Sequence, residues 1–166
     1  TTTLLQSSAA SDVYKRQPSG SNVETVAIAS NEQDQQGVFK EIGRWSTGSL
    51  DVNSNLSGDW SGNTWVSSNR DATVNIRYTI IQDDSNLAAF EFTDVVAAGD
   101  TIEITGSSNI ELTNLDTSSL TLLIEASWTA QPGTPPPAPP ANTTILMEYG
   151  SSSRDTGCLL YTSDAA

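Results

Sequence analysis

The sequence predicts an all-β protein, an antiparallel β-sandwich of the jelly-roll or immunoglobulin-like kind, with about eight or nine strands. Three observations carry this prediction. Apolar and polar residues alternate in several separate segments, clusters of Gly, Asn, Asp and Ser separate those segments, and none of them has the apolar stripe of an amphipathic helix. Because successive side chains of a strand point to opposite faces, this alternation gives a sheet one apolar face.

The clearest strand covers residues 72–81, where apolar side chains occupy every second position. The same period recurs in chain order at residues 88–93, 102–104, 110–112 and 120–128. Shorter apolar runs predict further strands at residues 23–29, 38–45, 50–52 and 64–66. Turn-forming clusters separate the regular segments at residues 83–86, 98–100, 106–109 and 114–119.

The apolar faces of these strands predict one shared core. It includes Val74, Ile76, Tyr78, Ile80, Phe90, Phe92, Ile102, Ile104, Leu120, Leu122, Ile124 and Trp128. The opposite faces carry Glu91, Glu103, Glu111 and Glu125, which we expect to be solvated.

The composition divides the chain into a sandwich domain at residues 22–130 and a Pro-rich linker at residues 131–141. The linker holds six of the seven prolines, and because Pro lacks a backbone N–H it cannot continue a sheet. We expect an extended, semi-rigid spacer there. Residues 142–157 resemble the first strand of a further, truncated unit.

Both ends of the chain match translated sequencing-adapter DNA. Residues 7–17 (SSAASDVYKRQ) are a translation of a transposase-type library adapter, and residues 158–166 (CLLYTSDAA) are a translation of its reverse complement. Residues 1–6 have no assignable origin, and residues 18–21 form a short polar lead-in. We therefore expect a shotgun-sequencing fragment whose tails, residues 1–21 and 158–166, are disordered. The only cysteine, Cys158, belongs to the adapter match.

Charge and composition exclude several functions. The formal net charge is −13, which disfavours binding to nucleic acid or to anionic membranes. The chain has no His, which removes His-based catalysis and His-based metal sites. No apolar run approaches the ~20 residues that span a bilayer, so membrane insertion is not expected.

The segment 48–65 contains the candidate binding residues. Asp51, Asn53, Asn55 and Asp59 have a spacing that can wrap a calcium ion, although the expected Gly and bidentate Glu of such a loop are missing. A polar loop explains the same residues. No other cofactor is expected.

Three tryptophans, Trp45, Trp60 and Trp65, cluster in or near the same segment. They are candidates for contact with a ligand or a protein partner, since exposed aromatic rings stack on sugars and anchor interfaces. Packing in the core or at a sheet edge is the alternative interpretation.

No catalytic residues are predicted, and we do not expect an enzyme. The strand carboxylates lie on polar faces rather than in the apolar surroundings that raise the pKa of a catalytic acid. No glycine-rich phosphate loop follows a strand and opens a helix.

In composition and strand pattern, residues 23–130 resemble β-rich structural modules of phage particles and tail fibres. The resemblance implies a structural or adhesive module of an extracellular assembly, either a virion tail fibre or decoration protein or a bacterial surface protein. Its partners would be proteins of that virion or cell surface, with glycan and an oligomeric form both possible, and its location extracellular or in the virion. The alternative is a carbohydrate-binding module attached to a secreted enzyme through the Pro-rich linker.

Overall fold

The structure is a computed structural model that describes residues 24–30, 36–51, 55–133, 143–149 and 157–161. Every regular element of these residues is a β-strand, and none is a helix. The strands are β1 (Glu24–Ser30), β2 (Lys40–Ser46), β3 (Gly58–Ser68), β4 (Ala72–Gln82), β5 (Ser85–Val96), β6 (Thr101–Ile110), β7 (Leu120–Ala130), β8 (Thr143–Tyr149) and β9 (Gly157–Tyr161). All their pairings are antiparallel, which confirms the predicted all-β class.

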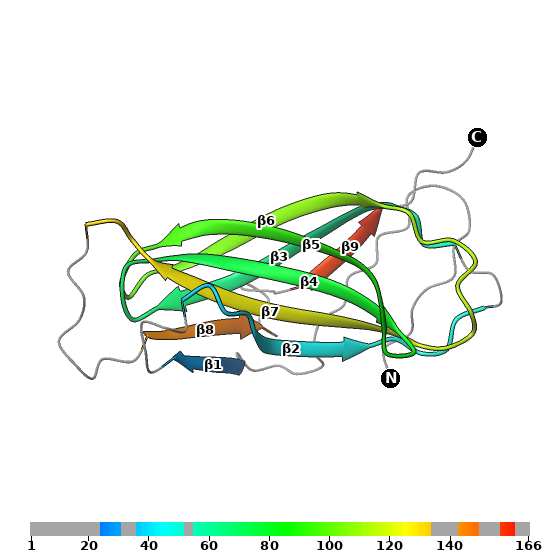
Figure 1. Cartoon of the computed structure of the whole chain (residues 1–166), viewed down its shortest axis with the longest axis horizontal. Coiled ribbons are helices and arrows are strands. Elements are labelled where there is room, and N and C mark those ends of the chain that lie inside the picture. The colour runs from blue at the N-terminus through cyan, green and yellow to red at the C-terminus, as the bar shows by residue number, and fades with distance from the viewer. Residues whose placement is uncertain (1–23, 31–35, 52–54, 134–142, 150–156, 162–166) are drawn as a thin grey trace.

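The strands form two sheets, which Figure 1 shows as two layers. One sheet, here called sheet A, has the order β1-β8-β3-β6, with β9 also paired to β3. The other, sheet B, has the order β2-β7-β4-β5. The pairing is nested, because β4 pairs with β5, β3 with β6, β2 with β7 and β1 with β8.

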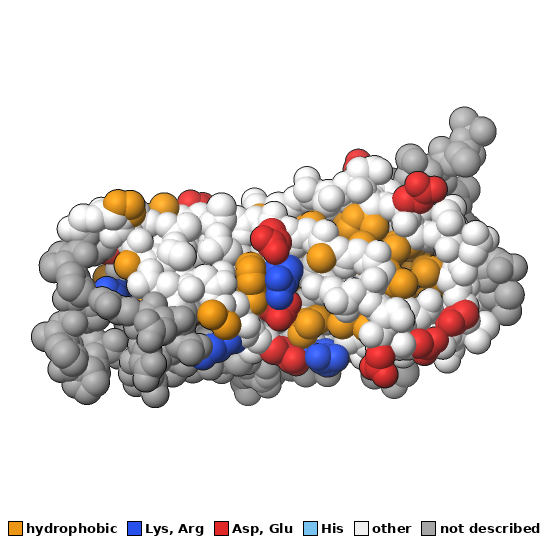
Figure 2. Space-filling model, viewed as in Figure 1, with side chains coloured by type: hydrophobic (Ala, Val, Ile, Leu, Met, Phe, Trp, Pro, Cys, Tyr) orange, Lys and Arg blue, Asp and Glu red, His pale blue; other side chains and the backbone are white. Residues whose placement is uncertain are grey.

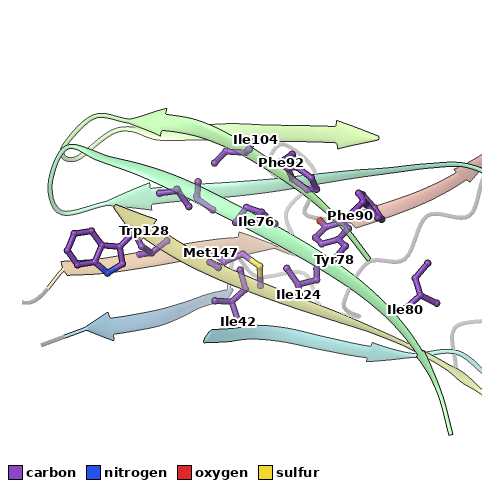
Figure 3. Packing of buried hydrophobic residues seen from close by; sticks show 14 of the residues in the cluster. Ile42, Ile76, Tyr78, Ile80, Phe90, Phe92, Ile104, Ile124, Trp128 and Met147 are labelled. Carbon is purple, nitrogen blue, oxygen red and sulfur yellow. The ribbon is translucent and has the colours of Figure 1, made fainter. Parts of the chain in front are cut away.

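The core lies between the two sheets and follows the predicted alternation. In β4 every second residue from Ala72 to Gln82 is buried, and the inward side chains of β3 alternate in the same way from Gly62 to Ser68. Ten of the twelve predicted core residues are buried, and Ile102 and Leu122 pack against the cluster while partly exposed. Figure 3 shows side chains of both sheets meeting in this core.

Two predicted elements differ from the structure. The turn expected at residues 106–109 lies inside β6, so the strand predicted at 102–104 continues to Ile110, where β6 ends, and residues 111–112 of the predicted next strand lie outside it. Gly106 pairs there with Gly62 of β3, and the small residues of both strands leave room for aromatic rings of sheet B. Leu50, expected in a strand, lies in a loop. The described part of residues 22–130 therefore contains seven strands, β1 to β7, rather than eight or nine.

The segment predicted to begin a separate unit belongs to the sandwich. β8 lies between β1 and β3, pairing with β1 from Thr143 to Tyr149 and with β3 from Ile145 to Glu148. Ile145 and Met147 are each 1% exposed and form part of the shared core. The expectation of a further unit at residues 142–157 was wrong because a Pro-rich segment can connect two strands of one domain as well as two domains.

The end that matches adapter DNA also contributes a strand. β9 pairs with β3 over five positions, from Gly157 opposite Asn63 to Tyr161 opposite Asp59, contrary to the expectation of a disordered tail from residue 158. If the pairing of β8 with β3 continued in the same register, Gly150 would lie opposite Asn63. The residue opposite Asn63 is Gly157, so the register of β9 on β3 differs from that of β8 by seven residues. Any short extended segment can pair through its backbone with an unpaired strand edge. The expected tail at residues 1–21 and residues 134–141 of the expected linker lie outside the described residues.

Candidate functional site

The three candidate tryptophans do not share a surface. Trp60 and Trp65 lie on one strand, β3, five positions apart, so their side chains point to opposite faces of sheet A. Trp60 packs against the core, and its indole Nε1 donates a hydrogen bond to the carbonyl oxygen of Leu56 at 3.0 Å. Trp45 lies on β2 of the other sheet and also packs against the core.

Trp65 is partly buried on the outer side of sheet A, where its register partners are Glu103 of β6 and Glu148 of β8. Trp45, Trp60 and Trp65 therefore do not form one surface, and the positions of Trp45 and Trp60 agree with the alternative interpretation of core packing. Trp60 and Trp65 both lie in the part of segment 48–65 that belongs to β3, and the alternation of side chains along a strand sends them to opposite faces.

The calcium candidates do not converge either. Asp59 lies in β3, where its Oδ1 accepts a hydrogen bond from the side-chain nitrogen of Asn109 at 2.6 Å. The side chain of Asn55 accepts a hydrogen bond from the backbone N–H of Ser57 at 2.9 Å, which forms a local turn. Asp51 is exposed in the preceding loop, and Asn53 lies outside the described residues. Within the part of the chain that is described, no group of three or more His, Cys, Asp or Glu residues is arranged to hold a metal.

Of the four carboxylates predicted on the polar faces of strands, Glu91, Glu103 and Glu111 are exposed as predicted, although Glu111 follows the end of β6. Glu125 differs, because its side chain is only 16% exposed and its Oε2 accepts a hydrogen bond from Nε of Arg77 at 2.8 Å. Arg77 also approaches Glu91 at 3.8 Å, and its guanidinium carbon lies 4.0 Å from the centre of the Phe39 ring. Two carboxylates and one aromatic ring thus hold this arginine in place on the outer face of sheet B.

Beside this ion pair the outer face of sheet B is hollowed. The cavity has a volume of about 460 Å³ and is open to solvent. Its lining comes from Arg77 and Thr79 of β4, residues 86–89 of β5, and Leu123 and Glu125 of β7. We call it the sheet B hollow. Figure 2 shows a basic side chain with acidic side chains above and below it near the middle of one face, and hydrophobic side chains to either side.

The register explains how the hollow is built. Thr79 lies opposite Ala89 on β5 and opposite Leu123 on β7, so a small residue stands on one side and a branched one on the other. Arg77 lies between Glu91 and Glu125 in the same two pairings. The sequence analysis missed this site because no spacing along one strand brings these residues together. Only the pairing of three strands does so.

The end of the sandwich near the β4–β5 turn carries further acidic residues. Asp83 and Asp84 form the turn with positive φ angles of 47° and 62°. The side chain of Asp83 accepts a hydrogen bond from the Ser118 hydroxyl at 3.0 Å. The hydrogen bond from the backbone N–H of Ser118 holds the pKa of the Asp116 carboxyl below its usual range. These contacts tie the turn to the loop that precedes β7.

On β2, a side-chain hydrogen bond to Glu41, together with the charge of that carboxylate, raises the pKa of the Arg44 guanidinium. This pair is solvent-exposed. The described part of the chain has no helix long and apolar enough to cross a membrane.

Comparison with known proteins shows similarity in fold alone. No family model matches the chain, and no curated protein matches its sequence. Among solved structures, the chain is similar to a protein chain in the structure of infectious bursal disease virus, Gx strain, with a TM-score of 0.50 and 14% identity over 95% of this chain and 37% of that one.

Two enzymes are similar at the same level. An aminopeptidase from the marine sediment archaeon Thaumarchaeota archaeon matches with a TM-score of 0.52 and 14% identity. An α-amino acid ester hydrolase matches with a TM-score of 0.50 and 10% identity. Each match covers 72% of this chain and 25% of the enzyme. The chain thus spans between a quarter and two fifths of the length of these three proteins.

Proposed function

We propose that the chain is a non-catalytic structural module of a virion, built as a jelly roll. The observation that carries the proposal is the nested pairing of strands, in which β4–β5, β3–β6, β2–β7 and β1–β8 are successive rungs of one rolled-up hairpin. Two four-stranded sheets connected in this way are characteristic of jelly rolls, a fold frequent in viral capsid and lectin domains. The ninth strand, β9, adds to sheet A without changing this order.

The similarity to a chain of infectious bursal disease virus supports a virion rather than a cell-surface origin, since that match extends over 95% of this chain. A virion module functions by contact with other protein subunits. Within a virion, we assign this chain to an exposed part such as a fibre or a decoration protein, because its charge of −13 would repel packaged nucleic acid. Its location would then be extracellular, on the particle surface.

A contact surface for neighbouring subunits is available on β5. This strand is last in the order of sheet B, and it carries Val95, the most exposed of the three large hydrophobic residues that are exposed in the described part of the chain. Val95 is 54% exposed. An edge strand with apolar side chains on its outer face is a ready surface for association.

Sedimentation velocity of the purified chain over a wide range of concentrations tests this function. We expect a defined oligomer, and we expect Val95→Asp to shift it to the monomer. Thr129→Asp, on the outer face of the same sheet but on β7, is the matched control and should leave the oligomer intact. A chain that stays monomeric up to its solubility limit would contradict the proposed structural role.

The second candidate function is a carbohydrate-binding module joined to a secreted enzyme by the Pro-rich segment. The matches to a quarter of two enzymes favour it, since they place a similar fold inside longer catalytic proteins. The positions of Trp45 and Trp60 against the core count against a sugar platform made of tryptophans. An open reading frame for a hydrolase domain in the same gene would favour this candidate, and neighbouring genes for virion proteins would favour the first.

A further inference from the structure

We infer that the sheet B hollow binds one neutral pyranose ring of a carbohydrate, with Thr79 at its base and Glu125 at its wall. This site is separate from the three tryptophans, and the inference does not depend on the proposed assembly of the chain.

The first observation is an unsatisfied hydroxyl. Thr79 is only 4% exposed although it lies on the outer face of sheet B, and within the described residues its side chain has no hydrogen-bond partner. The five other buried polar side chains all have one: Thr64, Ser68, Gln82, Ser127 and Thr143. A buried hydroxyl without a partner is unfavourable. Because Thr79 lies at the base of a hollow that is open to solvent, its hydroxyl is available to a ligand group that displaces water.

The second observation is the charge of the hollow. The guanidinium of Arg77 is neutralised by Glu125 at 2.8 Å and by Glu91 at 3.8 Å, so it offers no net positive charge to an anion. A cation would in turn meet that guanidinium. The hollow is therefore suited to a neutral ligand.

The third observation is the mixture of donors, acceptors and apolar groups. The Thr79 hydroxyl and the Asn86 amide can each donate and accept. Both contacts between Arg77 and Glu125 go to Oε2, and the described residues give Oε1 of Glu125 no hydrogen bond. Leu87 and Leu123 supply apolar walls. A pyranose has this combination, with hydroxyls around its rim and C–H groups on its faces.

The size and shape of the hollow agree with a sugar unit. Its volume of about 460 Å³ falls within the range of small-molecule sites. Because the hollow is open to solvent, a sugar within it could continue into a longer chain. A free hexose and the terminal unit of a glycan would make the same contacts.

Titration of the full chain with D-glucose, D-galactose, D-mannose and N-acetyl-D-glucosamine, followed by two-dimensional amide NMR, tests the inference. We expect at least one sugar to bind with a Kd of about 1 mM and to shift amide signals of β4, β5 and β7 around the hollow. The methyl glycoside of that sugar distinguishes the source of the ligand. Equal binding of the glycoside indicates a glycan end, and its loss indicates a free sugar.

Thr79→Val is the decisive variant, because it keeps the shape of the side chain and removes the hydroxyl. We expect the affinity to fall about fivefold to tenfold, the effect of one neutral hydrogen bond, while the fold stays intact. Thr129→Val is the matched control on the outer face of the same sheet, and it should bind as the unmodified chain does. Since the Val side chain has no polar group that needs a hydrogen-bond partner, Thr79→Val should fold at least as stably as the parent.

Three results would overturn the inference. The first is that none of the four sugars binds at concentrations near 0.1 M, roughly a hundred times the expected Kd. The second is that Thr79→Val leaves sugar binding unchanged, and the third is that the amide shifts are confined to residues outside the hollow. A chain that binds sugar but never assembles would contradict the proposed virion role and leave the hollow as argued. A chain that assembles but binds no sugar would do the reverse.

Discussion

The ring of Tyr78 occupies the space that a side chain at Gly62 would need. A Cβ atom added to Gly62 would lie 2.1 Å from Cε2 of Tyr78, which no folded protein accommodates without movement. Gly106, the register partner of Gly62 on β6, stands in the same relation to Phe92. Glycine inside a strand weakens it, but here each glycine receives an aromatic ring from the opposite sheet.

The same tyrosine links the sheets by hydrogen bonds. Its hydroxyl donates to the carbonyl oxygen of Asn63 at 2.9 Å and lies 2.8 Å from Oγ1 of Thr64. Its ring packs edge-on against Phe90 and Phe92, with ring centres 5.3 and 5.2 Å away (Figure 3). The position of sheet A over sheet B therefore depends on a small residue at position 62.

We expect Gly62→Ala to destabilise the fold by about 1–3 kcal/mol or more, the usual cost of overpacking a core. The new methyl group would push the Tyr78 ring away from Phe90 and Phe92. Urea unfolding followed by tryptophan fluorescence measures the effect. Gly48→Ala is the control, since a Cβ there meets nothing within 4 Å. Equal stability of the two variants would contradict the close approach of the sheets.

Truncation of the central core should be costly. Ile124→Ala or Ile76→Ala removes a side chain that is 0% exposed, and we expect a loss of about 2–5 kcal/mol. Glu91→Gln on the exposed face should change the unfolding free energy by less than about 0.5 kcal/mol. Denaturant titrations compare the three. If Glu91→Gln abolished folding while Ile124→Ala had no effect, the inside and outside of the sandwich would have been assigned the wrong way round.

Glu125 should behave differently from the other strand carboxylates. Glu125→Gln removes the negative charge that pairs with Arg77, and the partly buried guanidinium keeps only the more distant carboxylate of Glu91. We expect a loss of about 1–2 kcal/mol, below the full cost of breaking a buried pair because Arg77 is 31% exposed. Glu111→Gln, at an exposed position, is the control. A double-mutant cycle with Arg77→Met isolates the pair, and a coupling energy near zero would show that the contact contributes nothing.

Strict alternation made the core of sheet B readable from the sequence. One face of β4 consists largely of β-branched and aromatic residues and one face of β7 is entirely apolar, and most of the predicted core lies in these strands and β5. β3 and β6 were harder to predict because residues 58–63 and 105–109 are Gly, Asn, Asp, Ser, Thr and one Trp, a composition typical of turns. Their strand structure depends on rings from the opposite sheet, which no local pattern reveals.

The position of β8 and the sheet B hollow could not be predicted for a related reason. The apolar residues of β8 were visible, but its place between β1 and β3 is a contact between the two ends of the domain. Likewise, Thr79 and Glu125 are remote in sequence, and only the register of β4 on β7 brings them near one another. Long-range pairing decides both features.

The central claim is that β8 completes a single sandwich rather than beginning another domain. Thermal unfolding of the chain truncated after Gly133, compared with the chain ending at Gly157, tests it most directly. The shorter chain lacks Ile145 and Met147 from the core and the strand that pairs with β1. We predict that it shows no cooperative unfolding transition, whereas the longer chain does. Losing two buried side chains, at about 2–5 kcal/mol each, together with the strand between β1 and β3, is comparable to the ~5–15 kcal/mol that stabilises a whole domain. A cooperative transition at the same temperature in both chains would contradict the account.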